Sequence, residues 1–215
     1  MRLMNHRNKR ILSNDFQIER IKILVQFLLM LLASLVAGGI FTEFLNAELF
    51  LSLSQRVSMH FAAPFAGCMG IGDAVGAVLR YSAAELICIA VTFVFTFSVL
   101  NYVTSDLILV YRGFTGGFSA CLLYRILMME NTEYQPGWLR FFIFVGVKGC
   151  ILIGFFLYSW CAALYSYEMK RLNATGRAIW NTRVMGALVL GTIAFCGLIL
   201  FLNGFYCFLI FVLSK

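Results

Sequence analysis

The sequence predicts an all-α fold, a polytopic membrane helix bundle with about five transmembrane helices. Of the 215 residues, 61% are hydrophobic and only 13% are charged, whereas a soluble domain is about half apolar and about a quarter charged. Several apolar runs are long enough to cross the hydrocarbon layer, which takes roughly 20 helical residues. The chain also contains only two prolines, which suits long uninterrupted helices.

The first element is a basic segment over residues 1–22, which we expect on the cytoplasmic side. Its charged and apolar residues are interleaved, so it is interpreted either as a solvated tail that sets the topology or as a short helix in the inner interface. The first span follows over 23–45. We expect this span to stay uncleaved, because the apolar run is too long for a signal peptide and no small-residue cleavage site follows it.

Residues 46–82 are less apolar, and we expect them to form an outer segment between spans one and two. Apolar residues at helical spacing in its first half predict an amphipathic helix in the outer interface. They are Leu49, Phe50, Leu53, Val57 and Phe61. After Pro64 the chain becomes glycine-rich, and residues 64–82 are predicted either to re-enter the membrane, to pack loosely or to form a sixth short span.

The remaining apolar runs complete a single transmembrane domain over 23–215. Its further spans are predicted at 83–102, 107–128, 141–164 and 185–213. The connection at 103–106 is short, so spans two and three should form an antiparallel hairpin in which Ser105 or Asp106 caps the third span.

Lysine and arginine residues are distributed unevenly between the two predicted sides. With the N-terminus inside, segments 1–22 and 165–184 hold ten of them, and the outer segments together with Lys215 hold four. The positive-inside rule therefore favours an N-in, C-out orientation. Topology also accounts for the net charge of +7, so we expect membrane lipids and no nucleic acid as partners.

Three cationic residues lie within the predicted spans. A charge inside the membrane costs free energy, so such a residue indicates a function or a specific partner. Arg112 is placed about one and a half turns into span three, and it is interpreted as a snorkelling or paired side chain or as part of a substrate or partner path. Arg125, near the outer end, is expected to snorkel. Lys148 lies deeper in span four, with Glu85 or Glu43 as a candidate partner.

Glycines form a small-xxx-small pattern beside Arg112. Gly113 and Gly117 lie on one helical face, with Gly116 next to them, and such a face lets two helix backbones approach closely. The pattern predicts packing inside the bundle or, alternatively, a contact in a homo-oligomer or with a partner protein.

The residue inventory does not assemble a catalytic, cofactor or metal site. The only histidines, His6 and His60, fall outside the predicted spans, so a serine such as Ser119 would lack a histidine base. The sequence contains no HExxH pair, no P-loop and no CxxC pair among its seven cysteines. We therefore expect a protein that is not an enzyme.

One segment of the third span carries a resemblance to a known family. Residues 106–118 read DLILVYRGFTGGF, an apolar run followed by a basic residue, a glycine and then Gly-Phe. This segment, the layout of the spans and the basic N-terminus together resemble those of the stage II sporulation protein M family. Members of that family are integral membrane proteins. On this chain the resemblance touches Arg112, Gly113, Gly116 and Gly117, as a packing or docking element.

The resemblance implies a non-catalytic scaffold that anchors peptidoglycan-degrading partners at the septal membrane during sporulation and engulfment. The expected location is then the bacterial cytoplasmic membrane, and the partners are membrane-anchored or extracytoplasmic wall hydrolases. The alternative hypothesis is the permease subunit of a transporter whose ATPase is a separate chain. A transporter should have Arg112 and Lys148 facing one polar cavity, whereas a scaffold should have a dry bundle and an exposed apolar groove at its outer face.

Overall fold

The computed structural model describes residues 2–62, 71–98, 100–128, 137–174 and 182–213. These residues are almost entirely helical, and no strand occurs among them. The elements in chain order are α1 (Arg2–Phe41), the short 3₁₀ helix η1 (Thr42–Phe44), α2 (Ala47–Ala62), α3 (Ile71–Phe95), α4 (Asn101–Met128), α5 (Trp138–Ala174) and α6 (Thr182–Leu213).

Five helical segments in the described part of the chain are long and apolar enough to span a membrane. They are Ile18–Phe44, Gly72–Phe95, Asn101–Met128, Trp138–Glu168 and Met185–Leu213. Large apolar side chains such as Leu190 and Phe201 point outward from these segments, as expected where lipid rather than water surrounds the helices. The predicted fold class, an all-α membrane bundle with five spans, is thus confirmed.

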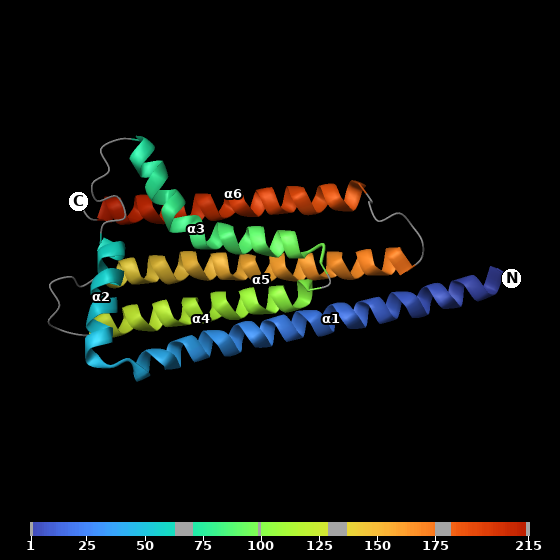
Figure 1. Cartoon of the computed structure of the whole chain (residues 1–215), viewed down its shortest axis with the longest axis horizontal. Helices are drawn as coiled ribbons and strands as arrows, with labels where there is room; N and C mark the ends of the chain where they lie inside the picture. The colour runs from blue at the N-terminus through green and yellow to red at the C-terminus, as the bar shows by residue number, and fades with distance from the viewer. Residues whose placement is uncertain (1, 63–70, 99, 129–136, 175–181, 214–215) are drawn as a thin grey trace.

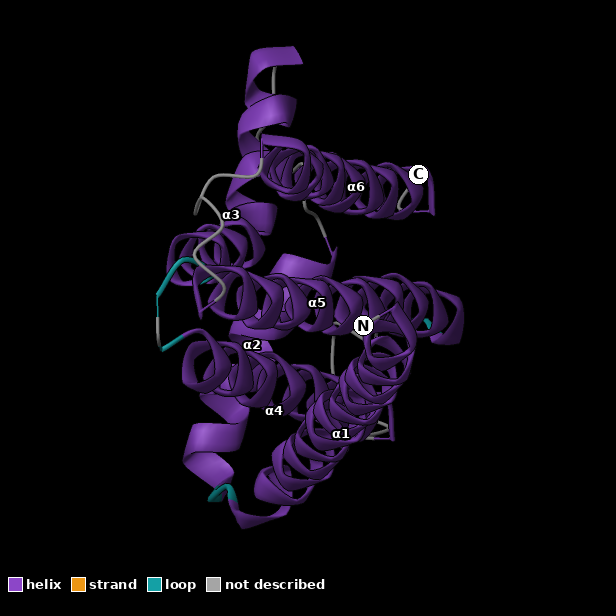
Figure 2. Ribbon diagram, turned by 90° about the vertical axis from the view of Figure 1, so that its right-hand side faces the viewer, coloured by secondary structure: helices purple, strands orange, loops and turns teal. Residues whose placement is uncertain are grey.

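The five long helices lie side by side, with α5 in the middle (Figure 1). Helices α1 and α4 lie on one side of α5, and α3 and α6 lie on the other (Figure 2). Helix α2 lies across one end of the bundle, which we call the α2 end (Figure 1). Because α5 contacts every other span, its inner face is among the most buried, with Phe155 and Ala162 fully covered.

The basic N-terminal segment is continuous with the first span. Helix α1 runs without interruption from Arg2 to Phe41 over 40 residues, and its first turns project beyond the bundle opposite the α2 end (Figure 1). Residues 2–22 are therefore part of one long helix, rather than a separate tail or a helix that turns away from the first span.

The turn between the second and third spans lies earlier than the sequence suggested. Helix α3 ends at Phe95 and α4 already begins at Asn101, so the predicted connection at 103–106 and the predicted boundaries at 102 and 107 are wrong. Within the actual turn, the Ser98 side-chain oxygen accepts a hydrogen bond of 3.2 Å from the backbone N–H of Leu100. Ser98 thus supports the turn in the way that Ser105 or Asp106 was expected to do.

Thr104, Ser105 and Asp106 lie inside α4, where each side chain makes at least one hydrogen bond. The Thr104 hydroxyl donates to the carbonyl of Leu100 at 3.1 Å, and the Ser105 hydroxyl donates to Asn101 Oδ1 at 3.3 Å. The Asp106 carboxylate accepts a 2.8 Å hydrogen bond from the Gln26 amide of α1. Residues that often cap a helix therefore form hydrogen bonds along α4 and from α4 to α1 in this protein.

The second half of the predicted outer segment belongs partly to a span. Helix α3 begins at Ile71, so residues 71–82 start the second span about three turns before the predicted boundary at 83. Residues 64–70, where re-entry was one alternative, lie outside the described residues. The fourth and fifth spans also sit in longer helices, α5 and α6, than the predicted ranges 141–164 and 185–213.

Glycines bring the backbones of α1 and α4 together. A Cβ atom built on Gly113 would collide with the Ser34 side chain, and one on Gly117 would collide with the backbone carbonyl of Leu35. From the opposite helix, a Cβ on Gly38 would collide with the carbonyl of Phe114. The small-xxx-small face of α4 therefore packs on α1 of the same chain.

The glycine contact can be tested by adding volume at Gly117. We expect Gly117→Val to destabilise the protein by about 1–3 kcal/mol, because the new side chain would overlap the α1 backbone, which cannot move without separating the helices. Thermal unfolding of the purified protein in detergent measures this. Gly197→Val is the matched control, since no atom lies within 4 Å of a Cβ there; equal melting temperatures for the two variants would contradict the packing.

Five crossings, the number of candidate spans in the described part of the chain, would place the two ends of the chain on opposite sides of the membrane, and the charge distribution predicts which side each end occupies. We expect alkaline phosphatase fused after Lys215 to be active and green fluorescent protein fused there to be dark. Fusions after residue 174, in the predicted cytoplasmic connection, should give the reverse. The same reporter active at both positions would contradict the five-span topology.

Candidate functional site

Glu85 is the buried acidic residue at the centre of the site. Its side chain is only 4% exposed, because it lies on the face of α3 that also carries the buried residues Ser82, Ile89 and Thr92. Spacings of three, four and seven residues put such positions on one side of a helix. Glu85 therefore lies on the face of α3 that packs into the bundle, and its carboxylate is inside the bundle.

Arg112 of α4 pairs with this carboxylate. Its Nη2 atom donates to Glu85 Oε1 at 2.8 Å, and its guanidinium carbon lies 5.2 Å from the centre of the Phe155 ring. The side chain is 12% exposed, so the charge is held by a carboxylate and an aromatic face of the protein.

Helix α4 begins earlier than predicted, and Arg112 is consequently deeper than predicted. It lies about 17 Å from the first residue of α4, Asn101, and about 24 Å from the last, Met128, at 1.5 Å per residue. With a hydrocarbon core about 30 Å thick centred on α4, Arg112 lies nearer the middle of the core than the one and a half turns from its edge that the sequence predicted. The bond to Glu85 corresponds to the paired alternative and not to snorkelling.

Lys148 of α5 shares the same carboxylate oxygen. Its Nζ atom donates to Glu85 Oε1 at 2.9 Å and to Asn203 Oδ1 of α6 at 3.1 Å. The same atom lies 5.6 Å from the centre of the Tyr81 ring. Of the two candidate partners named from the sequence, the structure therefore places Glu85, and not Glu43, beside Lys148.

Asn203 closes the connection back to α3. Its amide Nδ2 donates to the Ser82 hydroxyl oxygen at 3.0 Å, and that hydroxyl donates to the carbonyl of Val78 at 2.9 Å. Both Asn203 and Ser82 are fully buried. We refer to these five connected residues as the Glu85 network; they are Ser82, Glu85, Arg112, Lys148 and Asn203, and they come from α3, α4, α5 and α6.

The Glu85 network carries one negative and two positive charges, so its net charge is positive. Removing ions from water is costly, and close pairing with additional hydrogen bonds offsets that cost only where the geometry is good. Two buried atoms, Glu85 Oε2 and Arg112 Nε, have no hydrogen-bond partner within the described part of the chain. The network is therefore connected but has both donor and acceptor capacity to spare.

Two adjoining cavities border the network. The first, which we call the central cavity, has a volume of 350 Å³ and is lined by all three charged residues of the network, Glu85, Arg112 and Lys148, together with Ser119. The second, the α2-side cavity, has a volume of 250 Å³ and lies against Val57 of α2. Ser119, Phe144 and Lys148 line both cavities, so the two meet beside the lysine.

The glycines singled out from the sequence fall on two sides of α4. Gly113 and Gly117 contact α1, and Gly116 lines the central cavity. The structure therefore brings Arg112, Lys148 and Gly116 to one site and places Gly113 mainly in the helix contact. Gly117 belongs to both, because it also lines the central cavity.

Arg125 was expected to snorkel, but it contacts the end of the first span instead. Its Nη1 atom donates to the backbone carbonyl of Thr42 and lies 3.9 Å from a carboxylate oxygen of Glu43. Its guanidinium carbon also lies 4.8 Å from the centre of the Phe50 ring of α2. Arg125 thus connects α4 to η1 and α2 and belongs to the α2 end rather than to the network.

The sequence reasoning missed Asn203 and Ser82. A single amide inside the apolar run of α6 is a usable signal, because a buried side-chain amide in a span needs a partner on another helix. Ser82 carries little signal of its own, since a serine in a span commonly bonds to its own helix backbone, as Ser82 also does. Only the structure shows that it meets Asn203.

The geometry defines a class of protein: a multi-pass helical membrane protein in which four spans meet at a buried charge network. No protein-family model matches this chain, and no curated protein or solved structure is detectably similar to it. The role of the site is therefore argued from the contacts and cavities of this molecule.

The contribution of the Glu85 network to the stability of the protein can be measured by neutralising Glu85. We expect Glu85→Gln to lower the free energy of unfolding by about 3–5 kcal/mol, because it leaves Arg112 and Lys148 as buried cations without a counter-charge. Chemical or thermal unfolding in detergent checks this. The double variant Glu85→Gln, Lys148→Met should recover part of the loss, since it removes one stranded cation.

Glu48→Gln is the matched control, because Glu48 is exposed on α2 and its neutralisation should change stability by no more than about 0.5 kcal/mol. A Glu85→Gln variant as stable as this control would show that the network does not hold the helices together.

Proposed function

We propose that this protein is a non-catalytic membrane scaffold. In this proposal it resides in a bacterial cytoplasmic membrane and anchors peptidoglycan-degrading partners at the septal membrane during sporulation and engulfment. The observation that supports it best is the apolar surface at the α2 end. The sequence resemblance of residues 106–118 supplies the partner class.

Outside the two cavities, the inside of the bundle is cross-linked and closely packed, as a scaffold that needs rigidity would be. The charges of Arg112 and Lys148 are both held by Glu85, and Gly113 and Gly117 pack on α1. These features favour a protein whose chemistry belongs to its partners.

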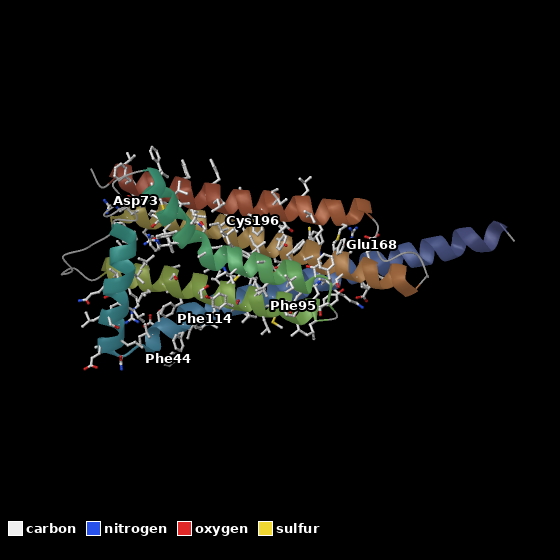
Figure 3. The ribbon with its side chains drawn as sticks, turned by 45° about the horizontal axis from the view of Figure 1, so that its top comes forward. Phe44, Asp73, Phe95, Phe114, Glu168 and Cys196 are labelled. Atoms are coloured by element: carbon white, nitrogen blue, oxygen red, sulfur yellow. The ribbon has the colours of Figure 1, made fainter. Side chains whose placement is uncertain are left out.

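The α2 end offers the surface for those partners. Helix α2 buries Phe50 and Ser54 against the bundle, while Leu49 and Leu51 are 47% and 55% exposed. Phe44, just before α2, is 78% exposed and lies at this end of the molecule (Figure 3). Exposed apolar side chains mark sites of contact with proteins or with the membrane, and we refer to Phe44, Leu49 and Leu51 together as the α2 surface.

Docking is thereby assigned to the α2 surface rather than to the glycine face of α4. In the N-in orientation this end faces the outside, which is where wall hydrolases work. The membrane-anchored or extracytoplasmic part of such a partner would cover the three apolar side chains. Lipids of the outer interface would surround the rest of α2.

Crosslinking and mass spectrometry of the tagged protein in its native membrane test the scaffold. We expect recovery of secreted or membrane-anchored wall hydrolases, and we expect the double variant Leu49→Ser, Leu51→Ser to lower that recovery about tenfold, as loss of an apolar contact of about 1–2 kcal/mol would. Ser52→Ala on the same helix is the matched control and should leave it unchanged. Hydrolase recovery that does not depend on the α2 surface would contradict the docking assignment.

A permease subunit is the second candidate, because Arg112 and Lys148 line one cavity, as two charged residues on a transport path would. The same crosslinking experiment separates the two functions. A cytoplasmic ATPase recovered in place of wall hydrolases would contradict the scaffold and favour the permease.

A further inference from the structure

We infer that the central and α2-side cavities form a binding site for a compact oxyanion that also carries a hydroxyl, the class that includes phosphate and phosphomonoesters. This inference does not rest on the scaffold proposal. It rests on the charges that line the two cavities, on the residues that the cavities share, and on two buried atoms of lining residues that have no hydrogen-bond partner within the described part of the chain.

The lining of the two cavities has an excess of positive charge. Arg112 and Lys148 share one carboxylate, which leaves the network with a net positive charge. Arg80 lines the α2-side cavity, is exposed, and makes no ion pair within the described residues. A mostly apolar surrounding strengthens the attraction between such charges and an anion, so an anion is the ligand that the site favours.

Three cationic residues line the two cavities one after another, from the α2 end toward the middle of the bundle. Arg80 lines only the α2-side cavity, Lys148 lines both, and Arg112 lines only the central cavity. An anion that enters beside α2 would meet these three cations in that order. The volumes of 250 and 350 Å³ lie just below and just above the lower limit for ligand sites, about 300 Å³, and therefore fit a compact ligand.

The spare hydrogen-bonding groups indicate that the anion also carries a hydroxyl. Arg112 Nε is a donor without a partner, and Glu85 Oε2 is an acceptor without a partner, within the described part of the chain. Both atoms are buried, so a ligand in the central cavity would bond to them once the two lining side chains turn toward it. A ligand with only acceptor atoms, such as chloride, could satisfy the first and not the second. Dihydrogen phosphate or a phosphomonoester monoanion supplies both kinds of group, and its single negative charge balances the net charge of the network.

The Ser119 hydroxyl adds a polar group where the two cavities meet. Ser119 lines both cavities beside Lys148 and Phe144. A hydroxyl and an ammonium at this junction suit phosphate oxygens, which accept several hydrogen bonds at once. A larger side chain at position 119 should therefore obstruct the site without removing any charge.

Equilibrium binding of radiolabelled inorganic phosphate to the full-length protein in phosphatidylcholine nanodiscs tests the site. We expect saturable binding that phosphomonoesters compete away and chloride does not. Arg80→Gln should weaken the affinity about tenfold, as the loss of one charge-assisted hydrogen bond does, and it leaves the Glu85 network intact. Ser119→Leu should weaken it at least as much by filling the junction.

Lys22→Gln is the matched control, because it removes an exposed cation of α1 that neither cavity includes; its affinity should equal that of the unchanged protein. Nanodiscs that contain phosphatidylglycerol identify the source of the oxyanion. If that lipid competes with phosphate, the site binds a lipid headgroup. If the lipid does not compete, the site binds a free anion.

Either source supports the site, provided that binding depends on Arg80. No saturable phosphate binding in phosphatidylcholine, together with no Arg80-dependent retention of phosphatidylglycerol, would overturn the inference. Phosphate binding that Arg80→Gln and Ser119→Leu leave unchanged would overturn it as well.

Discussion

Two cationic side chains, Arg112 and Lys148, share one carboxylate oxygen of Glu85 inside a bundle whose outer surface is apolar. Lipid offers these charges no hydration, so they must be neutralised within the protein. Because Glu85, Arg112 and Lys148 come from three different helices, the pairing fixes the depth at which α3, α4 and α5 meet. Asn203 extends the same constraint to α6.

Helix α1 is held by a different kind of contact. It contributes no residue to the Glu85 network and instead packs backbone to backbone against the glycines of α4. Two polar contacts secure the ends of this pair, Gln26 with Asp106 near one end and Arg125 with Thr42 near the other. Charge pairing together with the hydrogen bonds of Asn203 therefore connects four spans, and close packing adds the fifth. Both devices leave the α2 end free to carry the surface that we propose for partners.

The fold was largely predictable because hydropathy alone identifies spans that lipid surrounds. The boundaries were harder, since Thr104, Ser105 and Asp106 look like a cap and yet lie inside α4, where each side chain makes a hydrogen bond. This error placed Arg112 too near the membrane edge. The sequence did suggest Glu85 as a partner for Lys148, but it could not show that Arg112 uses the same oxygen, because that depends on how helices rotate and pack.

The glycine pattern was visible in the sequence, whereas its partner was not, since a small-residue face serves a neighbouring span and a second protein equally well. The cavities were likewise beyond the sequence, because they are formed by side chains from four or more segments. What the structure adds is therefore the convergence of residues that are distant in the chain. Their convergence connects the stability of the bundle to the binding site that we infer.

The most direct test of this account is a solid-state NMR measurement on the protein in lipid bilayers. Dipolar recoupling between the labelled side-chain carboxyl carbon of Glu85 and the labelled side-chain nitrogens of Lys148 and Arg112 reports their proximity. The Glu85 network predicts a strong coupling to both cations at once. A Glu85 carboxyl carbon that couples to neither would contradict the claim that one shared carboxylate organises the bundle.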